Sequence, residues 1–144
     1  MNKILSLILI GTLVTFIFDF LIILTAKINY LDFYGIHTYY NQLFFDTQNG
    51  FIFFIGILIY GGVFVLFDNI KISMSIFFIS FLVVLTFFIP TNGYNIGAYI
   101  FKSENHIYKR FGIMKKGDIL YENFEKYYIY DKDTENIIVI NKFD

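Results

Sequence analysis

The feature that most constrains this chain is an apolar run from Ile4 to Ala26 that holds a single charged residue, Asp19. About 20 such residues are needed to cross the hydrocarbon core of a bilayer, where a helix satisfies its own backbone hydrogen bonds. A cleaved signal peptide is the alternative, because Asn2 and Lys3 precede the run. The run exceeds the usual signal-peptide core of about 7–15 residues, and no small-x-small cleavage pattern stands at its end. The sequence therefore predicts an uncleaved transmembrane helix over residues 4–26.

Two further apolar runs, Phe51 to Phe67 and Ile72 to Ile89, contain no charged residue. Each is close to the lower limit for crossing a bilayer, so neither is expected to tilt much. Only residues 68–71 separate them, and a connection this short predicts two antiparallel helices in a hairpin. Pro90, followed closely by Gly93, is expected to end the third helix, because proline cannot continue the hydrogen-bond ladder.

The segment from residue 29 to residue 49 is neither a span nor an ordinary polar loop. Aromatic and apolar residues recur in it at helical spacing, and amphipathic tyrosine rings settle at the headgroup level of a bilayer. We expect a short interfacial helix here. The alternative is an aromatic loop that packs against the chain's own helices. The pattern is formed by Tyr30, Phe33, Tyr34, Ile36, His37, Tyr39, Tyr40, Leu43 and Phe44.

The charge density changes near residues 90–94, because charged residues are sparse before Asn92 and dense after Ala98. We therefore expect a membrane domain over residues 1–93 and a soluble β tail over residues 94–144. Runs rich in Tyr, Ile, Val and Phe, punctuated by turn residues, are typical of an antiparallel meander. The predicted strands are 99–102, 107–115, 118–122, 126–131 and 135–141, with turns at Lys116–Gly117 and Asp133–Thr134. The predicted fold class is membrane α-helical: three transmembrane helices followed by a small antiparallel sheet.

The composition narrows the function classes. Hydrophobic residues make up 57% of the chain and charged residues 16%, against about 25% charged in soluble domains. A net charge of -1 offers no basic surplus for nucleic acid. The chain has no cysteine, and we see no His/Asp/Glu cluster with metal spacing, no Ser/His/Asp arrangement and no Gly-rich phosphate loop. We expect a protein without metal or cofactor that is not an enzyme.

Asp19 is the sharpest single feature of the predicted spans. An ionisable group inside a span costs about 2.5–3.5 kcal/mol on insertion scales, so its position usually has a reason. Gly11, Thr15 and Asp19 recur every fourth residue and form one small, polar stripe that suits close helix packing. We expect Asp19 to hydrogen-bond within the bundle, with Thr15, Tyr60 and Ser80 as candidate partners, or to a second copy of the chain. A proton or cation relay is the alternative.

The tail carries two basic pairs, Lys109–Arg110 and Lys115–Lys116. Near an anionic bilayer each cation is worth about 1 kcal/mol, so these four residues are candidate headgroup contacts. The alternative is a mixed solvated surface, because acidic residues follow on the later strands. Those residues are Glu122, Glu125, Asp131, Asp133 and Glu135.

The orientation of the chain follows from the distribution of basic residues around three spans. Positive residues favour the cytoplasmic side, and the side that holds the tail has the larger number of them. We therefore expect a cytoplasmic tail, although a Met-Asn-Lys start argues for a cytoplasmic N-terminus. Heavy use of Phe, Ile, Asn and Lys is typical of an AT-rich bacterial genome, so the expected location is the bacterial inner membrane. The tail side holds Lys27, Lys102, Lys109 and Arg110, and the opposite side holds Lys3 and Lys71.

The stretch from Phe111 to Tyr130 resembles the small pleckstrin-homology-like β domains that follow a transmembrane hairpin in uncharacterised bacterial membrane proteins. The matching features are Gly112–Ile113, Lys116–Gly117, Tyr121, Phe124, Tyr128 and the run 137–140. The family's usual Trp is replaced by Tyr121, and the C-terminal helix of such domains is not seen, so a partial barrel or open meander is expected. The resemblance implies a cytoplasmic tail with a scaffold or sensor role, and it implies no catalytic residue.

A tail of about 50 residues is marginal as an independent fold, and its strands are apolar on both faces. We expect the interfacial segment, the membrane surface or another subunit to cover it, so a protein partner or a homo-oligomer is predicted besides the lipid bilayer. The predicted function is a multi-pass membrane protein whose β tail binds a protein or lipid headgroups. The alternatives are a small immunity or exclusion protein, and an accessory subunit of a transporter or channel, which depends on Asp19.

Overall fold

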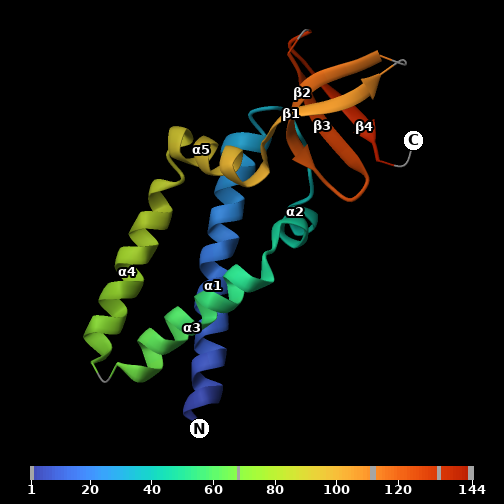
Figure 1. Ribbon diagram of the computed structural model, residues 1–144. Helices are drawn as coiled ribbons and strands as arrows, with labels where there is room; N and C mark the ends of the chain where they lie inside the picture. The colour runs from blue at the N-terminus through green and yellow to red at the C-terminus, as the bar shows by residue number, and fades with distance from the viewer. Residues whose placement is uncertain (1, 68, 111–112, 133, 143–144) are drawn as a thin grey trace.

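The computed structural model describes residues 2–67, 69–110, 113–132 and 134–142 (Figure 1). Within these ranges the chain forms five α-helices and one π-helical segment, followed by a four-stranded antiparallel sheet. The predicted order of a helical part and then a β tail is therefore confirmed. The number of membrane spans depends on the length and bending of the helices.

Helix α1 (Lys3–Ala26) continues without a break into the π-helical segment η1 (Lys27–Leu31). The side chain of Asn2 caps α1 by accepting the backbone N–H of Ile4 at 3.2 Å. Together Lys3–Leu31 form a helix of 29 residues, longer than the predicted span. In the described part of the chain it is the one helix that is by itself long and apolar enough to cross a bilayer.

The remaining helices form two sharply bent pairs. Helix α2 (Tyr40–Thr47) meets α3 (Gly50–Leu66) at 87°, and α4 (Ile70–Thr86) meets α5 (Pro90–Phe101) at 91°. Each pair is long and apolar enough to cross a bilayer only when its two helices are counted together. The described residues therefore hold one spanning helix, or up to three if each bent pair is a single span. The apolar runs predicted at 51–67 and 72–89 do form helices, each of 17 residues.

The third predicted helix ends before Pro90, as expected, but the chain then forms one more helix that the sequence did not predict. Helix α4 does end at Thr86, but Pro90 then occupies the first turn of α5, which continues to Phe101. Proline suits this position, because its missing N–H is one of those that a helix N-terminus leaves unpaired. The predicted strand at 99–102 is therefore the last turn of α5. The change from helix to strand falls at Lys102 rather than near residue 94.

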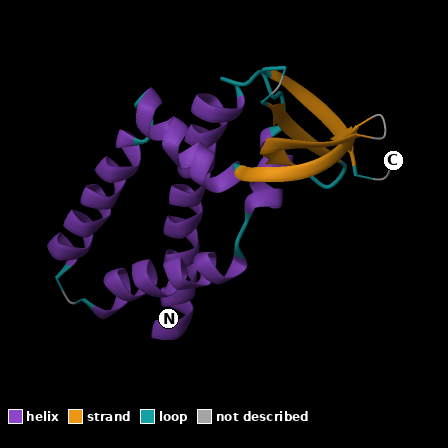
Figure 2. Cartoon of the chain, turned by 45° about the horizontal axis from the view of Figure 1, so that its top comes forward, coloured by secondary structure: helices purple, strands orange, loops and turns teal. Residues whose placement is uncertain are grey.

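The four strands follow each other in space as they do in the sequence, as a curved meander beside the helices (Figure 2). Strands β3 and β4 match the predicted runs. The predicted strand 107–115 is instead divided between the first two strands of a hairpin. The predicted turn at Lys116–Gly117 is wrong, because these residues pair with Ile107 and His106. The bounds are β1 (Ser103–Arg110), β2 (Ile113–Glu122), β3 (Lys126–Asp131) and β4 (Asn136–Asn141).

Gly117 lies in mid-strand because its surroundings leave no room for a side chain. A Cβ atom there would lie 2.6 Å from Ile129 Cγ2 and 2.7 Å from the carbonyl oxygen of Tyr130. Glycine inside a strand often marks such a close approach rather than a turn. From the sequence alone Gly117 indicates a turn. In the structure its small size instead lets the neighbouring strand approach closely.

One face of the sheet packs on the helical part. Tyr30 and Leu31 of η1 and Phe101 of α5 form a buried cluster with Leu120 and Tyr121 of β2. Residues 40–47 of the predicted interfacial segment form helix α2, and Leu43 from it is fully buried in the same cluster. Of the three covers considered for the sheet, the structure shows packing by this segment, together with η1 and α5.

Helices α1 and α3 cross at glycines. A Cβ atom at Gly11 would overlap the carbonyl oxygen of Ile57, and one at Gly61 would overlap the carbonyl oxygen of Leu7. Small residues of this kind let two helix backbones approach closely. Figure 1 shows α3 passing across α1, with the N-terminus and the link between α3 and α4 at the end of the molecule remote from the sheet.

Candidate functional site

Asp19 lies beside a cavity of about 190 Å³ between α1, α3 and α4. Its carboxylate accepts a hydrogen bond from Gln48 Nε2 at 2.6 Å. Gln48 stands just before α3 and was not among the predicted partners. Among those partners, Thr15 and Tyr60 line the same cavity, whereas Ser80 does not. The rest of the wall is formed by Phe18, Ile22, Ile52, Phe53, Gly56 and Val84.

The predicted stripe of Gly11, Thr15 and Asp19 faces α3. Gly11 and Thr15 are buried, and a Cβ atom at Gly56 would lie 2.5 Å from Thr15 Cγ2. The stripe is thus used for packing within the chain. Gly56 and Gly61 of α3 are its small counterparts, although their spacing is not that of the Gly-x-x-x-Gly motif.

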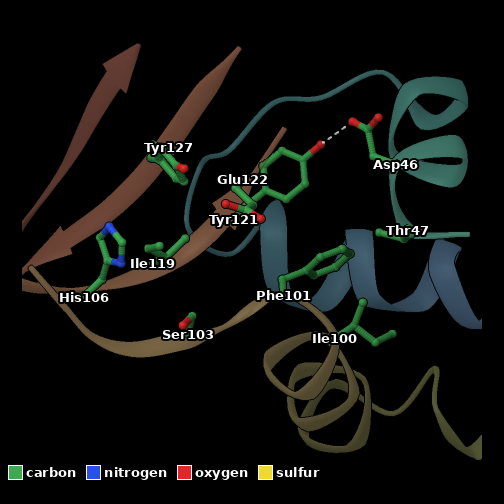
Figure 3. Close-up of a pocket in the computed structure, with 10 residues that line it drawn as sticks. All are labelled: Asp46, Thr47, Ile100, Phe101, Ser103, His106, Ile119, Tyr121, Glu122 and Tyr127. Atoms are coloured by element: carbon green, nitrogen blue, oxygen red, sulfur yellow. Dashed lines mark hydrogen bonds between the residues drawn. The ribbon is translucent and has the colours of Figure 1, made fainter. Parts of the chain in front are cut away.

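A second and larger cavity, of about 520 Å³, lies where the sheet meets the helices. We call it the junction cleft. Helix α2 provides one side of it, the end of α5 a second, and β1, β2 and β3 the remainder (Figure 3). The lining residues are Asp46, Thr47, Ile100, Phe101, Ser103, His106, Ile119, Tyr121, Glu122 and Tyr127.

Two carboxylates and three aromatic rings dominate the junction cleft. The hydroxyl of Tyr121 donates to Asp46 Oδ2 at 3.5 Å, which joins β2 to α2 (Figure 3). Burial, and then the nearby charge of Asp46, raise the pKa of Tyr121, so its hydroxyl remains a donor. The ring of Phe101 stands edge-on to that of Tyr121, with centroids 5.6 Å apart. These contacts fix the wall between the sheet and the helices.

The ring of Tyr127 already holds a cation from the chain itself. The ammonium of Lys142 lies 4.5 Å from the ring centroid and 3.5 Å from the carboxylate of Glu122. The imidazole of His106 stacks on Tyr127 with centroids 5.8 Å apart. An aromatic face next to a carboxylate attracts an ammonium or guanidinium group. The cleft therefore has the chemistry of a site for basic groups.

Asp118 is the centre of a charged network near the point where α5 ends and β1 begins. Its carboxylate accepts the backbone N–H of Asn105 at 3.0 Å and pairs with Lys132 at 2.9 Å and with Lys102 at 3.5 Å. Burial acts to raise the pKa of Asp118, but the Asn105 amide and the two ammonium groups outweigh it and hold the pKa below its usual range. The network ties β1 and the end of α5 to β2, which is a structural role.

The four basic residues predicted to contact headgroups are not equivalent in the structure. Lys115 pairs with the buried carboxylate of Asp131 at 3.2 Å, so its charge is engaged within the sheet. Lys116 is exposed on β2. The side chains of Lys109 and Arg110 lie outside the part of the chain that the structure describes. Across that part, no three His, Asp or Glu side chains gather as a metal site would require.

Comparisons with protein-family models, curated proteins and solved structures return no match for this chain. The case for a function therefore depends on the two cavities. Asp19 was identifiable from the sequence, whereas Gln48 and Asp46 were not, and Glu122 was noted only as part of a mixed solvated surface. Asp46 and Glu122 are far apart in the sequence and meet only because α2 packs against the sheet.

Proposed function

We propose that this chain is a non-enzymatic protein of the bacterial inner membrane whose helices anchor a β-sheet and whose junction cleft binds a basic segment of a protein partner. The observation that carries the proposal is the composition of the cleft. It is built jointly by α2, α5 and the sheet, and it places Asp46 and Glu122 beside Tyr121 and Tyr127. Neither the helices nor the sheet could form this site alone.

The membrane location is supported by the apolar side chains that the helices expose. Leu13 on α1, Ile52 on α3 and Ile79 on α4 are each at least 60% exposed, and many similar residues accompany them. In water such surfaces would be costly, whereas lipid chains cover them without loss. We propose three spans, with α3 and α4 crossing most of the bilayer and α2 and α5 lying near its surface on the side of the sheet.

The shape of the site favours a chain segment over an isolated small molecule. A smaller hollow of about 180 Å³ continues from the junction cleft and shares Asp46 and Glu122 with it. Phe124, 75% exposed, lines this extension. Two carboxylates and the exposed ring of Phe124 suit a lysine or arginine side chain followed by an apolar one, where the basic group would replace Lys142 beside Glu122. Tyrosine and arginine, with tryptophan, are also enriched among the residues that contribute most to binding at protein interfaces.

Site-specific photo-crosslinking in the native host tests this proposal. A benzoylphenylalanine in place of Ile100 lies in the cleft, and the same group in place of its neighbour Tyr99, which is 89% exposed and outside the cleft, is the matched control. We expect a discrete crosslinked protein from position 100 and none from position 99. Equal products from both positions, or none from position 100, would contradict the proposal.

Charge removal then tests the recognition chemistry. Combining Asp46→Asn with Glu122→Gln in the crosslinking chain should lower the yield about tenfold, as expected when a contact of about 1.4 kcal/mol is lost. Glu125→Gln, an exposed change in the turn between β2 and β3, should leave the yield unchanged. An undiminished yield in the double variant would show that the partner is not recognised through basic groups.

A further inference from the structure

We infer that the cavity beside Asp19 binds a monovalent metal cation, with the Asp19 carboxylate as the charged ligand and the Thr15 hydroxyl as a neutral ligand. This inference goes beyond the proposed function and does not depend on what occupies the junction cleft. It concerns a different part of the molecule, where α1 crosses α3.

The first argument is a surplus of unpaired oxygen atoms. Thr15, which lines the cavity, is only 8% exposed, and its Oγ1 atom is buried without a hydrogen-bond partner. The Oε1 atom of Gln48 is likewise buried without a partner, although Nε2 of the same amide donates to Asp19. Buried polar atoms are almost always paired. One unpaired oxygen belongs to a residue of the cavity wall and the other to the amide that is bonded to Asp19, which indicates a missing positive or donating species at this site.

The second argument is that no basic side chain accompanies Asp19. In the part of the chain that the structure describes, no Lys, Arg or His side chain forms an ion pair with it. The walls of its cavity are otherwise mainly apolar and aromatic. A carboxylate in such surroundings is unfavourable unless a positive charge accompanies it. A bound cation would supply that charge and also satisfy the unpaired hydroxyl of Thr15.

The ligand set and the volume decide which kind of cation fits. Carboxylate, hydroxyl and amide oxygens are hard ligands, which suit alkali and alkaline-earth ions rather than soft metals. Asp19 is the one acidic residue that lines the cavity, whereas divalent ions are usually held by several carboxylates or by phosphate as well. A volume of about 190 Å³ holds an ion with a few waters. These features favour a single positive charge, and we take Na⁺ as the probe.

The position of Gln48 gives the ion a route of entry. Gln48 and the exposed Asn49 form the short polar link between α2 and α3. This link lies next to Asp19, so the site is at the polar end of α3 rather than in the middle of an apolar surface. A hydrated ion can therefore approach the carboxylate without crossing the apolar wall.

The test uses the purified full-length chain in mild detergent, with NaCl, KCl or choline chloride at equal ionic strength. Thermal unfolding should shift upward with Na⁺ in a saturable manner and should not respond to choline. Isothermal titration with NaCl should show one site. Thr15→Val should weaken Na⁺ binding about tenfold, as expected for one lost contact of hydrogen-bond strength. Asp19→Asn should abolish the Na⁺ response, whereas Asp32→Asn, which removes an exposed ion pair with Lys27, should retain it.

Three results would overturn the inference. The first is equal stability in all three salts together with no titration heat from Na⁺. The second is an undiminished Na⁺ response in Asp19→Asn. The third is a response to pH that is identical in Na⁺, K⁺ and choline, which would assign the site to a proton alone. If Asp19→Asn fails to fold, the titration of the unmodified chain and of Thr15→Val still decides the question.

Discussion

At the scale of single residues, the glycines of α1 and α3 determine how closely the two helices approach. Gly11 and Gly61 each face a backbone carbonyl of the other helix, so neither position has room for a methyl group. Gly62 is the neighbour of Gly61, but it points into open space, where the nearest atom to an added Cβ is Leu66 Cδ1 at 3.8 Å. Gly61 is therefore required for the close approach of the two helices, whereas Gly62 is not.

This difference gives a matched pair of substitutions. Gly61→Ala should destabilise the protein by about 1–3 kcal/mol, the usual cost of overpacking, because the backbone of α1 must move. Gly62→Ala should be neutral or slightly stabilising, because alanine is the better helix former by up to about 1 kcal/mol. Thermal unfolding in detergent measures both. Equal effects from the two variants would show that the helices do not cross as described.

Asp118 gives a prediction about pH. Its pKa is lower in the folded protein than in the unfolded chain. The stabilisation is therefore complete above the unfolded pKa of about 3.9 and is lost as the pH falls through the lower, folded value. Asp118→Asn should cost about 1–2 kcal/mol at neutral pH and should flatten the acid limb of the stability curve. Unfolding measured between neutral and acidic pH provides the check.

A suitable control for Asp118 is Asp32, whose pair with Lys27 at 2.9 Å is more exposed. Exposed pairs of this kind contribute about 0–1 kcal/mol. Asp32→Asn should therefore leave the acid limb almost unchanged. If both variants shift the curve equally, the network around Asp118 has no special role.

At the scale of elements, the sequence predicted those that depend on local pattern. The apolar runs became α1, α3 and α4, and Asn2, Asn49 and Asn69 cap their N-termini. The runs rich in Tyr, Ile and Val became β3 and β4. Each of these elements requires only a local run of suitable residues and, for the helices, a capping residue at the N-terminus. Both can be read from the sequence.

Elements whose boundaries depend on distant contacts were missed. Pro90, Gly93 and Gly97 look like turn residues, yet α5 uses the glycines to approach η1, where a Cβ at Gly97 would overlap Tyr30. Gly117 is required by Ile129 and Tyr130 in the neighbouring strand. The candidate sites show the same dependence on distant contacts. Asp19 could be identified as a charged residue in an apolar run. Asp46 and Glu122 could not be identified as parts of one site, because they come together only where α2 packs on the sheet.

The docking of the sheet is itself testable. Tyr121 is 1% exposed and lies in the cluster that joins β2 to η1, α2 and α5. Tyr121→Ala should cost about 3–5 kcal/mol, as expected for a large buried side chain, and should loosen the sheet. Limited proteolysis should then cut near Lys102. Val139→Ala, on an exposed part of β4, should leave the cleavage pattern unchanged, and equal cleavage of both variants would contradict the docking described.

At the scale of the whole molecule, the account requires the sheet and the α3–α4 link to lie on opposite sides of a membrane. Figure 1 shows the N-terminus and this link at one end, with α2, α5 and the sheet at the other. With three proposed spans and the orientation that the basic residues favour, Lys27, Lys102 and the sheet would lie in the cytoplasm, and Lys3 and Lys71 would lie outside. The junction cleft would then face cytoplasmic proteins.

Cysteine accessibility tests this arrangement most directly, because the chain has no cysteine of its own. Lys71→Cys and Val139→Cys each introduce one thiol at an exposed position. With a membrane-impermeant maleimide, we predict labelling at position 71 in intact cells and at position 139 only after permeabilisation. Labelling of position 139 in intact cells, and of position 71 only after permeabilisation, would still support three spans but would place the sheet outside the cell. Labelling of both positions from the same side, or recovery of the chain in the soluble fraction, would contradict the account.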